Sequence, residues 1–119
     1  MRMSISTLLN LGVSGFLFVG AGVGGFQGSP TPCLVALWTG IGVFYPIFCN
    51  HSKKGSPDGE PWVGGPEHEA WRKKSIEQRY RMFPCVYTLA GRASRGGLPV
   101  MLPMFLEFPR ENWLEIGIN

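Results

Sequence analysis

Hydrophobic and small residues fill the first part of the chain without interruption by charge. From Met3 to Ser52 there is no Asp, Glu, Lys or Arg. Ordinary globular chains contain roughly 25% charged residues, so a gap of this length indicates a medium that excludes charge, most simply a lipid bilayer. The pattern therefore predicts an α-helical membrane protein.

Two apolar stretches within this block have the length of membrane spans. The first, residues 5–26, would cover about 33 Å as a helix, enough for a hydrocarbon core of about 30 Å. The second, residues 32–50, has a core that reaches about 25 Å, which local thinning of the bilayer would accommodate. Residues 27–32 between them contain two prolines, a glycine and no charge, which is typical of a tight loop. We expect a two-helix transmembrane hairpin over residues 1–50.

Small residues mark the faces on which the two expected helices would pack. The first stretch contains a pair of glycines at the G-x-x-x-G spacing and a second pair of small residues at the same spacing. The second stretch contains one further pair of small residues at that spacing. Such residues let two helix backbones approach closely in a membrane. The predicted helix-packing residues are Gly20, Gly24, Ala21, Gly25, Ala36 and Gly40.

Basic residues at both edges of the block predict its orientation. Lys53 and Lys54 directly follow the second stretch, and Arg2 precedes the first. By the positive-inside rule both termini face the cytosol, or the matrix or stroma of an organelle. The N-terminus also resembles a secretory signal peptide, but residues 5–26 are longer than a usual signal core. We therefore expect an integral membrane protein with an uncleaved first span.

The remainder of the chain is polar and divides into three parts. Residues 51–65 are rich in Gly and Pro and predict a linker, whereas residues 66–83 predict an amphipathic basic helix that ends at a proline. This helix either packs on its own protein or lies on anionic lipid headgroups. Residues 84–119 predict an irregular apolar tail. The residues expected at the membrane surface are Lys53, Lys54, Arg72, Lys73 and Lys74.

A glycine pattern in the first stretch resembles the dinucleotide-binding fingerprint. Four apolar residues precede Gly20-x-Gly22-x-x-Gly25. In that fingerprint a helix begins at the glycines, but here Pro30 and Pro32 follow almost at once, and no acid lies about 20 residues further on. We therefore expect no cofactor.

Few residues in the chain have the spacing of a catalytic or metal site. Cys49-x-His51 could ligate a metal, a haem or a chlorophyll, but one or two ligands without partners are weak evidence, and a structural or exposed histidine is the favoured interpretation. No nucleophile has a plausible base and orienting group nearby in the sequence. The sequence predicts no enzyme and neither catalytic nor metal residues.

Charge and length narrow the function to a membrane component. The net charge of +3 is spread over a mixed tail without a cluster of Lys and Arg among aromatics, which argues against nucleic-acid binding. The leading interpretation is a non-catalytic accessory or scaffolding subunit whose partners are membrane lipids and the transmembrane helices of a larger complex or of a second copy. A small pore-forming or transport-modulating oligomer is the alternative. A recently arisen reading frame without settled function is a further one.

Overall fold

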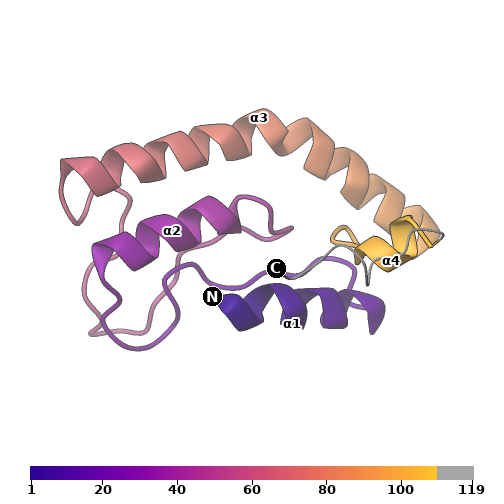
Figure 1. The fold of residues 1–119 in the computed structure, drawn as a ribbon, viewed down its shortest axis with the longest axis horizontal. Helices are drawn as coiled ribbons and strands as arrows, with labels where there is room; N and C mark the ends of the chain where they lie inside the picture. The colour runs from indigo at the N-terminus through magenta and orange to yellow at the C-terminus, as the bar shows by residue number, and fades with distance from the viewer. Residues whose placement is uncertain (110–119) are drawn as a thin grey trace, which may run out of the picture.

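A computed structural model describes residues 1–109, without the side chain of Arg2. This part of the chain contains four helices, α1 (Arg2–Val13), α2 (Pro32–Gly42), α3 (Pro66–Gly96) and α4 (Met104–Glu107). The long helix α3 runs along one side of the molecule, with α2 beneath its first half and α4 near its end (Figure 1). The helix α1 lies on the opposite side from α3 (Figure 1). Helices α2 and α3 pack against each other.

Two extended segments, residues 17–23 and 47–53, run parallel to each other between the helices. The N–H of Ile47 donates to the carbonyl of Val19 at 3.0 Å, and the N–H of Val23 donates to the carbonyl of Cys49 at 2.8 Å. Both bonds fit one parallel register, in which residue numbers rise in the same direction on both segments. A parallel pair needs a long crossover connection, and α2 supplies it. The arrangement is that of a βαβ unit.

The start and the buried face of α2 are encoded locally. The hydroxyl of Thr31 accepts the N–H of Leu34 at 3.2 Å, and Pro32 occupies the first helical turn, where its missing N–H costs nothing. The helix buries Val35, Ala36, Thr39 and Gly42. These residues form one stripe at helical spacing, so α2 presents a continuous face to the interior of the molecule.

Helix α3 begins at Pro66, the residue at which the sequence predicts a helix, but it does not end before Pro84. It continues to Gly96, and Gly97 closes it in the left-handed conformation with a φ of 71°. A proline inside a helix removes one hydrogen bond and costs about 3 kcal/mol, and α3 bends near its middle (Figure 1). The expected irregular tail is therefore helical over its first residues. Its part beyond residue 109 lies outside the described residues.

The predicted transmembrane hairpin is wrong. Within the first expected span, helix α1 ends at Val13, and the chain turns away at Gly15, which has a φ of 99°. Helices α1 and α2 have 12 and 11 residues, whereas a span needs about 20. Within residues 1–109 no helix combines the length and the apolar character needed to cross a bilayer. The charge-free block instead forms two short helices and a parallel extended pair, whose apolar sequences do not differ in composition from a membrane span.

Candidate functional site

Within residues 1–109, one face of the two extended segments is left largely exposed. Side chains alternate along an extended chain, so Val19 and Val23 are buried against the rest of the molecule while their neighbours point to the other side. The hydrogen bonds place Ile47 opposite Gly20 and Cys49 opposite Gly22. A side chain at Gly20 would overlap the carbonyl oxygen of Ile47. We call this surface the open face, and its exposed or half-exposed members are Phe18, Gly20, Gly22, Ile47, Cys49 and His51.

The carboxyl ends of both segments meet at one edge of the open face. The rings of Phe26 and His51 lie there with their centroids 5.7 Å apart, and the N–H of Lys53 donates to the carbonyl of Phe26 at 3.0 Å. The side-chain amide of Asn50 donates to the carbonyl of Gly59 and holds the following loop against the segment. Ligands of parallel α/β folds bind at the carboxyl ends of the strands. We therefore take Phe26, Asn50, His51 and Lys53 as the candidate site and call it the carboxyl-end site.

The carboxyl-end site has an aromatic and polar character without acids of its own. No Asp or Glu occurs in residues 17–53, and the first acids after the second segment are Asp58 and Glu60. Both are exposed and lie in the loop that leads to α3. The sequence-predicted pair Cys49 and His51 lies on the open face, with Cys49 free and exposed. Among residues 1–109 no three His, Cys, Asp or Glu side chains gather as a metal site would require.

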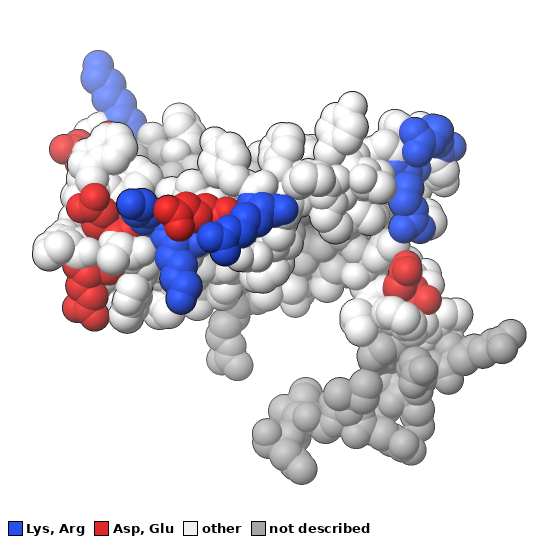
Figure 2. All heavy atoms as spheres, turned by 90° about the horizontal axis from the view of Figure 1, so that it is seen from above, with Lys and Arg blue, Asp and Glu red and all other residues white. Residues whose placement is uncertain are grey.

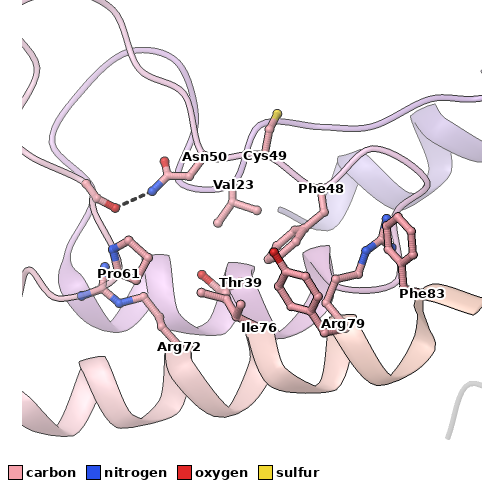
Figure 3. Close-up of a pocket in the computed structure, with 12 residues that line it drawn as sticks. Val23, Thr39, Phe48, Cys49, Asn50, Pro61, Arg72, Ile76, Arg79 and Phe83 are labelled. Atoms are coloured by element: carbon pink, nitrogen blue, oxygen red, sulfur yellow. Dashed lines mark hydrogen bonds between the residues drawn. The ribbon is translucent and has the colours of Figure 1, made fainter. Parts of the chain in front are cut away.

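A cavity of about 360 Å³ lies between the second segment and α3. Figure 3 shows Val23 and Phe48 on one wall and Ile76 and Phe83 on the other. The lining is mainly apolar, and two arginines of α3 border it. This cavity belongs to the interface between the extended pair and its covering helix.

Arg79 joins α3 to the turn that begins the second segment. Its guanidinium donates to the carbonyls of Val43 at 2.9 Å, Tyr45 at 2.7 Å and Pro46 at 2.7 Å, and it lies 5.9 Å from the ring centre of Phe48. The three carbonyls stabilise the charged side chain in a buried position. Burial lowers the pKa of Arg79 because it penalises the charged form. This residue positions the segment that carries His51.

The predicted helix-packing residues do not lie on one pair of helices. Gly20, Ala21, Gly24 and Gly25 belong to the first extended segment and the turn after it, where no helix forms. The pair from the second stretch, Ala36 and Gly40, lies in α2. Close backbone approach does occur at Gly20, but its neighbour is an extended chain and not a helix.

The residues predicted at a membrane surface differ in exposure. Lys53, Lys54, Lys73 and Lys74 are exposed, whereas Arg72 is buried. Figure 2, which looks down on the molecule from the side of α3, shows basic and acidic side chains interleaved over that helix. Contact of the four lysines with lipid stays a prediction.

The comparison with protein families decides the class of the chain. Residues 1–89 match the model of the glycosyl hydrolases family 31 TIM-barrel domain. The chain belongs to this family. The two parallel segments with their helices are thus a section of a family 31 barrel, in which eight parallel strands alternate with helices.

Relatives of the chain are α-glucosidases. It is 42% identical over 109 residues to a probable glucan 1,3-alpha-glucosidase of Oryza sativa subsp. japonica, covering 92% of this chain and 12% of that protein. It is 41% identical over 109 residues to alpha-glucosidase 2 of Bacillus thermoamyloliquefaciens, covering 92% of this chain and 14% of that protein. The crystal structure of a family 31 alpha-glucosidase from Bacteroides thetaiotaomicron superimposes with a TM-score of 0.86 at 39% identity, covering 93% of this chain and 19% of that one. The chain thus spans about an eighth of the length of the curated relatives it matches.

Family membership overturns the functional predictions. The interpretation as a non-catalytic accessory or scaffolding membrane subunit is wrong, because the relatives are glycosidases. The alternative interpretations, a pore-forming or transport-modulating oligomer and a recently arisen reading frame, are wrong for the same reason. The prediction of no enzyme is also wrong, because the matched family is one of glycosyl hydrolases. The predicted location as an integral membrane protein with both ends inside is also wrong, since the matched domain is a TIM barrel.

The sequence contained one signal for the true fold. The four apolar residues before Gly20-x-Gly22 lead into the first extended segment, and the glycines after them lie in that segment and in the turn that follows it. The early Pro30 and Pro32 and the missing acid argue against a dinucleotide site, but they do not argue against an extended segment followed by a turn and a helix. In the structure those prolines belong to the loop and the first turn of α2, so the strand, the turn and the helix are all present.

Proposed function

We propose that this chain forms part of a TIM-barrel α-glucosidase and supplies one wall of its sugar site. The observation that carries the proposal is the carboxyl-end site of a family 31 barrel section, where Phe26 and His51 lie side by side. Active sites of TIM barrels lie at this end of the strands. The carboxyl-end site is thus the place at which an α-glucoside would bind.

The side chains of the carboxyl-end site suit a sugar. The ring of Phe26 offers an apolar surface on which the C–H face of a glucose ring can stack, and the imidazole of His51 can donate to or accept from a hydroxyl. Asn50 is engaged with Gly59, so it shapes the loop and does not face the sugar freely. The wall therefore orients the substrate.

Hydrolysis of a glycosidic bond canonically uses two carboxyl groups. One protonates the leaving oxygen and the other attacks the sugar or activates water, at a spacing of about 5–5.5 Å or about 6.5–9.5 Å. The extended segments and their carboxyl ends contain no acid. We infer that both catalytic carboxylates come from barrel strands outside the described residues, while this section binds and positions the glucoside.

A chimeric enzyme tests the proposal. Residues 1–109 replace the matching stretch of the Bacillus alpha-glucosidase 2, and hydrolysis of p-nitrophenyl α-glucoside is measured alongside thermal unfolding. We expect a folded chimera that hydrolyses the glucoside, and a His51→Ala chimera with kcat/KM lower by roughly tenfold, because one hydrogen bond to the sugar is lost. His68→Ala in α3 is the matched control and should leave kcat/KM unchanged. A folded chimera without hydrolysis, or equal activity of both histidine variants, contradicts the proposed role.

A further inference from the structure

A second, smaller cavity lies behind the carboxyl-end loops. Its volume is about 60 Å³, and it is lined by the turn at Gly24, the first residue of α2 and the loop of residues 52–59. The side chains of Asn50, Ser56, Asp58 and Arg72 line it. Glycines, prolines and valines make up most of the rest of the lining, so the cavity is mixed in character but more polar than the larger cavity. A cavity needs only about 10–15 Å³ to hold one water, so this one has room for several waters or one small ion.

Arg72 reaches this cavity from the second turn of α3 with one nitrogen unsatisfied. Only 3% of the residue is exposed. Its Nη1 donates to the carbonyl of Glu60 at 2.9 Å and its Nε to the carbonyl of His68 at 3.3 Å, whereas its Nη2 has no hydrogen-bond partner in the described part of the chain. Figure 3 shows the guanidinium beside Pro61, at one end of the larger cavity. A buried donor without a hydrogen-bond partner lowers the free energy of unfolding, so an acceptor bound at this nitrogen would stabilise the fold.

The positive charge of Arg72 also has no acid as a hydrogen-bond partner in the described part of the chain. Burial lowers its pKa, and the nearby Glu69 raises it by a smaller amount, so desolvation of the guanidinium is the larger effect. Both protein partners of Arg72 are neutral backbone carbonyls. Buried charges in proteins are ordinarily paired. An anion in the small cavity would supply the missing charge.

Ser56 provides a second unsatisfied group on the same cavity. Its hydroxyl is buried and, within residues 1–109, has no hydrogen-bond partner. The loop and α3 thus place two unpartnered donors on one small polar cavity. Guanidinium and hydroxyl donors together are the usual ligands of phosphate, sulfate and carboxylate groups.

We propose that this cavity is a binding site for a small oxyanion, with Arg72 Nη2 and Ser56 Oγ as its donors. The carboxylate of Asp58 also lines the cavity and opposes an anion, but Asp58 is exposed and can turn toward solvent. An anion bound here would tie the loop of residues 52–59 to α3. The site shares Asn50 with the carboxyl-end site but differs from it in its donors, Arg72 and Ser56, and in its ligand.

Titration of the full 119-residue chain with inorganic phosphate tests the site. We expect thermal unfolding to shift upward with phosphate in a saturable manner, and calorimetry at constant ionic strength to show one binding event. Ser56→Ala removes one donor without touching the carbonyl bonds of Arg72, so the affinity should fall about tenfold. Asp58→Asn removes the opposing charge and should raise the affinity. Arg72→Gln should abolish binding, with far-UV circular dichroism as the check that the chain still folds.

An exposed cation serves as the matched control. Lys74→Gln removes one positive charge from the surface of α3 and should leave phosphate affinity unchanged. Sulfate and acetate in place of phosphate then report the preferred shape of the anion. If phosphate produces no saturable shift, or if Ser56→Ala binds as tightly as the unmodified chain, the cavity holds water only and the proposal is overturned.

Discussion

Arg79 and Tyr45 are 34 residues apart in the sequence and are joined by one short hydrogen bond. The Nη1 of Arg79 on α3 donates to the carbonyl of Tyr45 at 2.7 Å, at the turn that leads into the second extended segment. The ring of Tyr45 is almost fully buried, with 1% of the residue exposed, and belongs to a core cluster with Leu8 and Val19. The bond therefore fixes the covering helix to the core residue that anchors the segment carrying His51.

Replacing Arg79 should destabilise the fold strongly. Arg79→Met keeps much of the side-chain volume but leaves the carbonyls of Val43, Tyr45 and Pro46 without this donor. We expect the free energy of unfolding in urea to fall by about 3 kcal/mol. Arg81→Met, on the same helix but exposed, should change it by less than about 0.5 kcal/mol. Equal effects of the two variants would show that the carbonyl contacts of Arg79 contribute nothing.

A methyl group at Gly20 should be poorly tolerated. The added carbon would overlap the carbonyl and the side chain of Ile47, which are held by the parallel pairing. We expect Gly20→Ala to lower the free energy of unfolding by about 1–3 kcal/mol, the range for overpacking. Gly96→Ala in α3 meets no atom within 4 Å and should be neutral or stabilising. Equal stability of Gly20→Ala and the unmodified chain would contradict the close approach of the two segments.

The hydroxyl of Tyr45 connects the core to α1. It lies 2.7 Å from the hydroxyl of Ser4. Tyr45→Phe and Ser4→Ala should each reduce the free energy of unfolding by about 0.5–1.5 kcal/mol, and the double variant should cost less than the sum, because both remove the same bond. Strictly additive values from chemical denaturation would mean that this bond does not couple α1 to the core.

The N-cap of α2 offers an independent test of the crossover helix. Thr31→Ala removes the oxygen that accepts the N–H of Leu34 and should cost about 1 kcal/mol. Thr88→Ala is the matched control, because its hydroxyl donates within an exposed turn of α3. We expect the control to stay within about 0.5 kcal/mol of the unmodified chain. An unchanged melting temperature for Thr31→Ala would indicate that α2 begins elsewhere.

The sequence allowed the start of α3 and the loop before α2 to be predicted, because both depend on local chemistry. Pro66 with acids in the first turn marks a helix start wherever it occurs. Pro84 is a poor guide to the end of α3, since the helix continues through the proline to Gly96. The main error lies in the charge-free block. An apolar extended segment and a membrane helix share an apolar composition, and the hydrogen bonds to a partner segment distinguish them.

The carboxyl-end site could not be predicted for a similar reason. Phe26 and His51 are far apart in the sequence and come together because two parallel segments end at the same edge. The pairing of Gly20 with Ile47 that brings this about is a non-local contact. The sequence predicts Arg72 at a surface because its helix is rich in charge, and nothing local marks either Arg72 or Arg79 as buried, since their burial depends on how α3 lies over α2.

Amide hydrogen exchange over residues 16–26 and 47–53 tests the central claim, that the charge-free block forms a parallel extended pair. The account predicts slow exchange at the N–H groups of Val23 and Ile47, which donate across the pair, and fast exchange at Gly20 and Gly22, which do not. A helix through this region would protect every amide after its first turn. Continuous protection from residue 9 to residue 26 would therefore contradict the barrel section and restore the helical span.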